Sequence, residues 1–246
     1  GLLAVVGPDV VLLRLMLAVV GFAALVLVGA VVRREKGPTA EAIYGVFAAA
    51  SPFVLTTLPT IASYSAVACF ALALCAYGLA LRSPRGAAVA GLGIGLATAV
   101  RIAYAPAAVA LLIALGRRDG RRSAAIFAAA AAASLAAFAG WWVLRDPAAA
   151  WQNIVGAQLE RTRWTPYLWQ TNPWTNRLRV AAALALHVIA PLLVTVPLWK
   201  GRFARRGRGA RAGASPSLLG VLIAAVVLAH FVPTPSYLVY FASVAP

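Results

Sequence analysis

The chain has 246 residues, of which 63% are hydrophobic and only 11% charged, and its formal net charge is +16. A soluble domain of this length needs more polar surface than this composition supplies, so an ordinary soluble protein is excluded and a lipid bilayer is the expected environment. The basic residues form short clusters between long apolar stretches, without a nucleic-acid-binding motif, so nucleic acid is not an expected partner.

In chain order, the apolar stretches predict an all-α fold, a polytopic transmembrane helical bundle with about eight crossings in a single domain over residues 1–246. The predicted crossings are Asp9–Val32, Ala40–Leu58, Ile61–Leu81, Gly86–Val100, Ile102–Leu115, Ser123–Leu144, Val180–Trp199 and Pro216–Phe231. The sequence starts at Gly1 and stops at Pro246 as another apolar run begins, so we expect it to be a fragment of a longer protein.

Basic clusters follow alternate crossings and predict the orientation of the bundle. If the helices alternate in direction, all of these clusters fall on one face, which the positive-inside rule assigns to the cytoplasm. The alanine- and arginine-rich composition hints at a bacterium with a GC-rich genome, so the expected location is the bacterial inner membrane. The clusters are Arg33, Arg34 and Lys36; Arg82 and Arg85; Arg117, Arg118, Arg121 and Arg122; and Lys200 through Arg211.

Arg101 separates two apolar runs that are each too short to cross a hydrocarbon core of about 30 Å comfortably. A single long helix would put Arg85 and Arg117 on opposite faces, against the charge rule, whereas a hairpin keeps both inside and places Arg101 at its outer apex. An arginine in apolar surroundings is costly unless it pairs, snorkels or faces a wet cavity. The sequence therefore predicts a hairpin, with Arg101 either binding a phosphate or snorkelling to the outer headgroups.

The outer loop at 145–179 is rich in aromatic residues, including Trp151, Trp164 and Trp169. Tryptophan and tyrosine favour the headgroup level of a membrane, and a helix from Pro147 to Arg163 would be amphipathic. We therefore expect a juxtamembrane helix that lies on the outer surface and roofs the bundle.

Few other residues offer chemistry. For Glu35, Glu41 and Asp119 we expect charge balance beside neighbouring cations, and for Asp146 a helix cap. No carboxylate pair has a convincing spacing for acid–base catalysis, so the catalytic residue is unknown. Cys69 and Cys75 have no disulfide or metal-ligand pattern, and neither a metal nor another cofactor is indicated.

His230 lies at the end of the last predicted crossing, and Tyr237 and Tyr240 follow shortly after it. Two prolines break the helix there, so these three residues are candidates for lining a substrate cavity, or else form an interfacial aromatic anchor. Gly91, Gly93 and Gly95 only superficially resemble a nucleotide-binding fingerprint. The Gly91-x-x-x-Gly95 spacing inside an apolar helix predicts close helix packing instead.

Several segments together resemble the GT-C glycosyltransferases, in particular the branch of protein mannosyltransferases and aminoarabinose transferases. The likeness covers almost the whole chain. The segments are Leu13-Arg14-Leu15 through Arg33-Arg34, Ala50-Ser51-Pro52-Phe53, Tyr77 through Arg82, Gly91 through Arg101 and on to Pro106, Pro147 through Arg163, and Pro233 through Tyr237 with Tyr240-Phe241 and Pro246.

This resemblance implies a transferase that takes a sugar from a polyprenyl-phosphate-linked donor and acts on the outer side of the membrane. It also implies a catalytic acidic residue in an outer loop that precedes the helix matching Asp9–Val32, so we expect the catalytic carboxylate to lie outside this sequence. Family members often carry an arginine after the Ser-Pro segment, where this chain has Thr56-Thr57-Leu58-Pro59.

Three hypotheses of function follow. The first is a membrane glycosyltransferase whose partners are the bilayer and a lipid-linked sugar donor, with Arg101 as the candidate phosphate-binding residue. The second is a multi-pass transporter or flippase for a lipid or small solute, and the third is a structural membrane subunit. One large outer loop, small inner loops and the lack of an internal repeat favour the transferase.

Overall fold

We describe the fold from a computed structural model, which places residues 10–50, 63–152, 156, 178 and 217–231. Every element in this part of the chain is a helix, as expected for an all-α protein. The elements are α2 (Val10–Lys36), α3 (Pro38–Ala50), α5 (Ser63–Leu81), α6 (Pro84–Val100), η1 (Ile102–Tyr104), α7 (Ala105–Arg118), α8 (Gly120–Leu135), η2 (Ala136–Gly140), α9 (Trp141–Arg145), α10 (Pro147–Trp151) and α13 (Leu218–Phe231).

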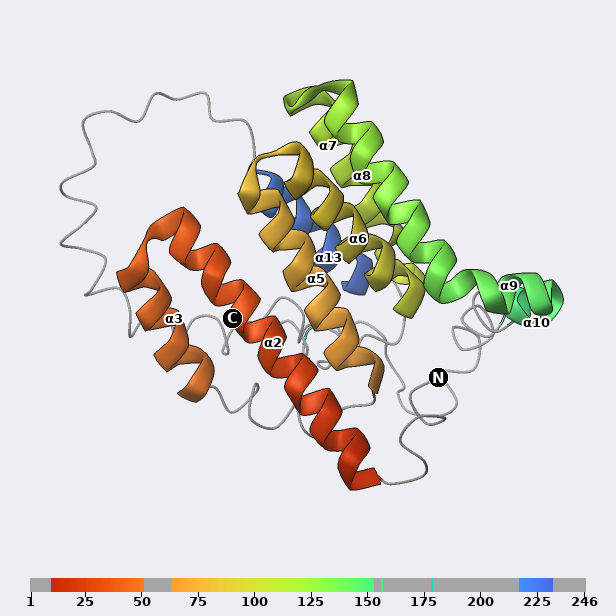
Figure 1. Cartoon of the computed structure of the whole chain (residues 1–246), viewed down its shortest axis with the longest axis horizontal. Coiled ribbons are helices and arrows are strands. Elements are labelled where there is room, and N and C mark those ends of the chain that lie inside the picture. Colours follow the sequence, from red (N-terminus) through yellow and green to blue (C-terminus); the bar gives the residue numbers. More distant parts are fainter. Residues whose placement is uncertain (1–9, 51–62, 153–155, 157–177, 179–216, 232–246) are drawn as a thin grey trace.

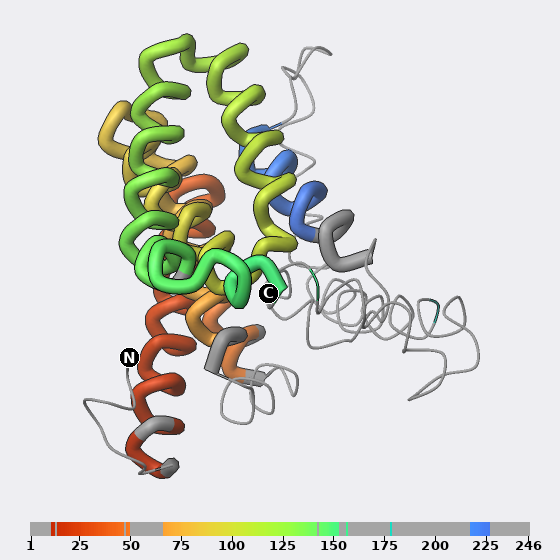
Figure 2. Tube along the Cα trace, turned by 90° about the vertical axis from the view of Figure 1, so that its right-hand side faces the viewer, coloured from red at the N-terminus to blue at the C-terminus, as the bar shows by residue number. Residues whose placement is uncertain are grey.

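The main helices form two layers (Figures 1 and 2). In the front layer α2, α5, α6 and α8 lie side by side, and α3 packs along the outer flank of α2. Behind them, α7 and α13 pack against each other, and α13 also contacts α5. Seven of the predicted crossings overlap described helices, although residues 51–58 of Ala40–Leu58 lie outside the described residues, as does the whole of Val180–Trp199.

Small residues let the front layer pack closely. Gly91 and Gly95 lie against the main chain of α8, at Phe127 and Ala131, and Gly93 on the other side lies against α5 at Cys75. A side chain at any of these glycines would overlap the neighbouring backbone. The predicted packing role of Gly91-x-x-x-Gly95 is therefore confirmed, and α6 is held tightly between two neighbours.

Among the described residues, two helical spans are long and apolar enough to cross a bilayer, Arg14–Lys36 in α2 and Gly120–Gly140 in α8 and η2. Core helices of soluble proteins and signal sequences can pass the same test. However, only 22% and 11% of the most apolar windows of these spans are buried inside the protein. Apolar side chains such as Phe22 and Val26 are instead exposed along α2, which fits contact with lipid.

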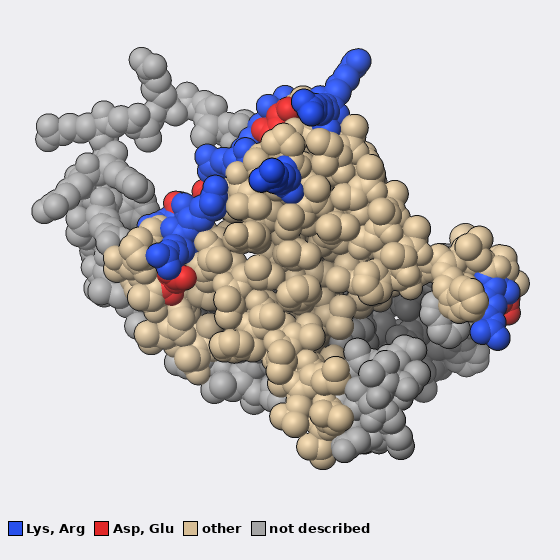
Figure 3. Space-filling view, viewed as in Figure 1, with Lys and Arg blue, Asp and Glu red and all other residues tan. Residues whose placement is uncertain are grey.

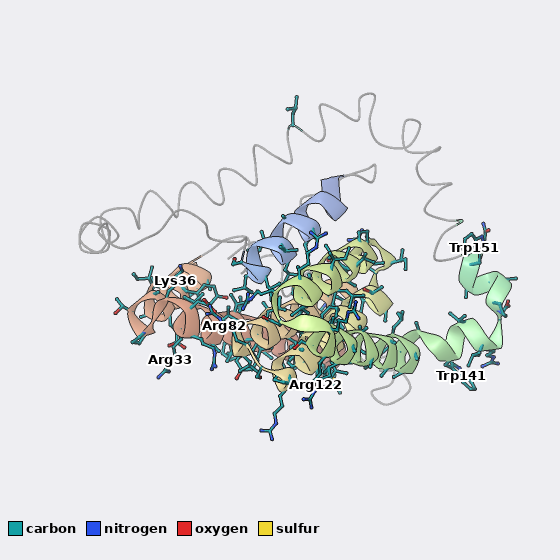
Figure 4. All side chains as sticks on the ribbon, turned by 90° about the horizontal axis from the view of Figure 1, so that it is seen from above. Arg33, Lys36, Arg82, Arg122, Trp141 and Trp151 are labelled. Carbon is teal, nitrogen blue, oxygen red and sulfur yellow. The ribbon has the colours of Figure 1, made fainter. Side chains whose placement is uncertain are left out.

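Most of the described charges gather at one end of the bundle, as expected for the first three predicted basic clusters, while the fourth, Lys200 through Arg211, lies outside the described residues (Figure 3). The turns α2–α3, α5–α6 and α7–α8 meet there, and the cations form a band along that edge, while the rest of the visible face carries almost no charge. We call this edge the basic end, and the opposite edge the far end. Figure 4 shows the same separation, with Arg33, Arg82 and Arg122 on one side and Trp141 and Trp151 on the other.

The predicted sixth crossing, Ser123–Leu144, differs in detail from the observed helix. The α-helical part ends at Leu135, and a π-helical turn, η2, leads into α9 and α10, which project from the bundle as a short arm (Figure 1). A π turn adds a residue to the helical repeat and so shifts the residues beyond it around the axis. Apolar periodicity does not reveal such a turn, because Ala136–Gly140 is as apolar as the helix before it.

Candidate functional site

Arg101 sits in the backbone turn between α6 and α7. It caps α6 in an extended conformation (φ −149°, ψ 115°), its backbone N–H donates to the Ala97 carbonyl at 2.8 Å, and its own carbonyl accepts from the Tyr104 N–H at 3.1 Å. Pro106 lies in the first turn of α7 and cannot donate a helical hydrogen bond to residue 102, so a continuous helix through Arg101 is disfavoured. The local sequence thus dictates the break.

The break reverses the chain, and the predicted hairpin is confirmed. Helix α6 starts at the basic end with Arg85, and α7 returns to that end with Arg117 and Arg118. The 17 residues of α6 span about 25 Å at 1.5 Å per residue. Arg101 therefore lies at the far end of the bundle, partly buried and separated from every described basic cluster by roughly the thickness of a hydrocarbon core.

Two hydroxyl-bearing residues next to Arg101 were not identified from the sequence. Tyr104, three residues later, is only 2% exposed in η1, and Thr98, three residues earlier, is buried with its hydroxyl donating to the Ile94 carbonyl at 2.8 Å. Thr98 lies in the last turn of α6 and Tyr104 at the end of η1, so both are close to Arg101 in sequence, on either side of the break. Both are buried, and the Thr98 hydroxyl is engaged within α6.

Of the other candidates, the structure places only His230 near this end. Helix α13 contacts α7 and η1 and runs from the basic end towards the far end (Figure 1). The end of its backbone, which includes position 230, therefore lies at the same end as Arg101. The side chain of His230 is outside the described part. Tyr237 and Tyr240 lie outside the described residues altogether.

The carboxylates at the basic end are engaged in ion pairs. Both oxygens of Glu35 accept hydrogen bonds from Arg82 Nη2, at 3.1 and 3.0 Å. Glu41 lies 3.6 Å from Arg33 and Asp119 lies 3.2 Å from Arg118. The predicted charge-balancing role of these three residues is confirmed, and their position opposite Arg101 separates them from any reaction there.

At the far end, Asp146 caps α10, since its Oδ1 accepts the backbone N–H of Ala149 at 2.9 Å. The predicted capping role is confirmed. Helix α10 covers only the first residues of the segment Pro147 to Arg163, for which an amphipathic helix was predicted, and most of the remainder lies outside the described residues. Within the described residues, no group of three or more His, Cys, Asp or Glu side chains could hold a metal ion.

Comparison with protein families decides between the hypotheses. Residues 2–244 match the family described as glycosyltransferase family 87. The chain belongs to glycosyltransferase family 87. No curated protein and no solved structure matches the chain.

Membership of family 87 makes this chain a membrane glycosyltransferase and confirms the first hypothesis at that level. The match covers nearly all of the chain, so the helical bundle belongs to the part of the protein that defines the family. In this family 87 protein, Arg101 lies in the turn between α6 and α7, at the far end of the bundle.

Proposed function

We propose that this family 87 protein transfers a sugar from a polyprenyl-phosphate donor to an acceptor at the outer face of the bacterial inner membrane. The observation that carries the proposal is the position of Arg101, a partly buried cation at the turn of an apolar hairpin, at the end opposite the basic clusters. The resemblance to the GT-C branch of lipid-phosphate-dependent transferases supports the choice of donor.

The orientation follows from charge. The described cations outnumber the carboxylates at the basic end, and cytoplasmic loops of membrane proteins carry the excess of lysine and arginine. With the basic end in the cytoplasm and the bundle crossing the bilayer repeatedly, Arg101 faces the outer leaflet. A phosphate of the donor would meet a guanidinium there, which can form two parallel hydrogen bonds to its oxygens.

The donor head would lie between the turn at Arg101 and the end of α13. In this arrangement His230, Tyr237 and Tyr240 contribute polar atoms to the substrate cavity, and the helix that starts at α10 covers it from outside. None of the carboxylates at the basic end is proposed as the catalytic base, because each is paired and lies across the bundle from Arg101.

The test is a transfer assay with the full-length protein in membrane vesicles. Radiolabelled sugar supplied as a polyprenyl-phosphate derivative should reach an acceptor, whereas the same sugar supplied as a nucleotide derivative should not, once endogenous lipid carriers are removed. Direct use of the nucleotide sugar would reject the proposed donor. Movement of intact lipid-linked sugar between leaflets without transfer would favour a flippase instead.

A further inference from the structure

At the basic end, several arginines have no carboxylate to balance them. Each of the three described carboxylates there already forms an ion pair: Glu35 with Arg82, Glu41 with Arg33, and Asp119 with Arg118. Arg34 instead donates a hydrogen bond from Nε to the Ala80 carbonyl at 2.8 Å. A group of exposed arginines remains that forms no ion pair within the described part of the chain. We call this group, which consists of Arg85, Arg117, Arg121 and Arg122, the arginine cluster.

The cluster is brought together by the packing of α6, α7 and α8. Gly91 lies against Phe127 and Gly95 against Ala131, with the same offset in residue number at both contacts. The two helices therefore run in the same direction and in register, so the first turn of α6 is level with the first turn of α8. Arg117 lies in the last turn of α7, just before the turn into α8.

For three members of the cluster, the local electrostatics of the helices are unfavourable, whereas Arg117 lies in the last turn of α7, where a cation is favoured. Arg85 lies in the first turn of α6, and Arg121 and Arg122 lie in the first turn of α8, and neither turn contains an acidic residue. The N-terminus of a helix carries a partial positive charge, so cations there are repelled. Asp119 precedes α8 but makes no side-chain cap and instead contacts Arg118. None of the described carboxylates at the basic end therefore neutralises these arginines, and the cluster is exposed to a partner of opposite charge.

We propose that the arginine cluster binds headgroup phosphates of anionic phospholipids in the leaflet at the basic end. The cluster lies where apolar helix walls meet solvent, which is the level of lipid headgroups (Figure 3). Guanidinium groups bind phosphate oxygens in a bidentate manner, and clusters of lysine and arginine next to the ends of transmembrane helices attract anionic lipids. This site is separate from the donor site at Arg101.

The experiment uses the full-length protein, purified and delipidated in a neutral detergent. Lipid affinity is measured by native mass spectrometry during titration with phosphatidylglycerol or with phosphatidylcholine. Wild type should retain phosphatidylglycerol preferentially. The triple variant Arg117→Gln/Arg121→Gln/Arg122→Gln should lose roughly a hundredfold in affinity for it, since each cation near an anionic surface is worth about 1 kcal/mol.

Two controls separate the cluster from general effects. The matching triple lysine variant should keep most of the preference, because it keeps the charge, and Arg145→Gln at the far end should leave it unchanged. Equal retention of phosphatidylglycerol by the wild type and the triple glutamine variant would overturn the proposal. So would saturation of the site by inorganic phosphate at the same concentration, because a free ion and not a lipid would then be the ligand.

Discussion

Gly93 of α6 lies directly against the backbone of Cys75 in α5, so that a Cβ atom at position 93 would fall 2.5 Å from the Cys75 nitrogen. The same Cβ would also fall 2.5 Å from the Ala71 carbonyl oxygen. Backbone atoms cannot move aside as a flexible side chain can. The spacing between α5 and α6, and with it the position of the Arg101 turn, therefore depends on the absence of a side chain here.

Gly93→Ala should destabilise the bundle by about 1–3 kcal/mol, the usual cost of overpacking a closely packed core. The measurement is the midpoint of thermal aggregation in detergent, read by size-exclusion chromatography. Gly116→Ala in α7 is the matched control, because its nearest neighbour would be the Ala124 Cβ at 3.7 Å, an ordinary contact. That variant should match or exceed wild type, since alanine favours a helix by about 0.5–1 kcal/mol over glycine. Equal midpoints for the two variants would contradict the close approach.

The turn between α5 and α6 is strained at Arg82, the one non-glycine residue with positive φ (49°) among the described residues. Arg82→Gly and Arg82→Ala both remove the ion pair with Glu35, but only glycine relieves the backbone. We expect the glycine variant to be more stable than the alanine variant by about 1 kcal/mol. Thermal midpoints of the two variants give the answer, and an alanine variant as stable as the glycine variant would show that the turn is unstrained.

The ion pair itself should contribute little. Arg82 has a 63% exposed side chain and Glu35 a 24% exposed one, so solvent screens their attraction. A double-mutant cycle with Glu35→Gln and Arg82→Gln should yield a coupling of about 0.2–1 kcal/mol, which falls further at high salt. A coupling well above this range, or one that does not depend on salt, would mean that the pair is shielded from water in the membrane-bound protein.

Arg101 should control donor binding. Arg101→Ala should weaken binding of the polyprenyl-phosphate donor by about 1.5–3 kcal/mol, the usual contribution of a charged hydrogen bond, and Arg101→Lys by less. Arg14→Ala is the control, because Arg14 is an exposed cation near the start of α2, also away from the basic end. Donor affinity is measured with the full-length protein. If Arg101→Ala binds the donor as tightly as wild type does, Arg101 does not bind the donor phosphate and serves only to anchor the turn to lipid headgroups.

The orientation of the bundle can be tested by cysteine labelling. In a variant without Cys69 and Cys75, single cysteines at Arg34, Arg85 and Arg118 should react with an impermeant reagent only from the cytoplasmic side. A cysteine at Arg145 should react only from the outside. The same comparison extends to Arg206 inside and Trp164 outside, which lie beyond the described residues. Labelling of positions 85 and 145 from one side would reject the topology.

The arm formed by α9 and α10 should continue as a helix on the outer surface. Trp141 and Trp151 are 67% and 64% exposed, as expected for aromatic anchors at the headgroup level. Nitroxide labels placed one by one along residues 148–161 should show oxygen accessibility that oscillates with a period of about 3.6 residues. A period of two would indicate a strand, and uniformly high oxygen accessibility would indicate another crossing.

Composition and local patterns were enough to predict the class of the protein and several local features. Composition excluded a soluble fold, the charge clusters predicted a shared basic end, and the two short apolar runs between Arg85 and Arg117 predicted a hairpin at Arg101. The cap at Asp146 and the packing motif Gly91-x-x-x-Gly95 were also predicted from the sequence. These features depend either on residues close together in the chain or on whether a whole segment prefers lipid or water. Both can be recognised from a short stretch of sequence.

Which helices contact each other could not be predicted from the sequence and is known only from the packed bundle. That Gly93 faces α5 while Gly91 faces α8 depends on how α6 is rotated between two neighbours, and a uniformly apolar helix gives no periodic signal for its rotation. The pair of Glu35 and Arg82 joins residues 47 positions apart, and Tyr104 is buried only because α6, α7 and α13 surround it. Such contacts are chosen by the fit of whole surfaces, which no local pattern encodes.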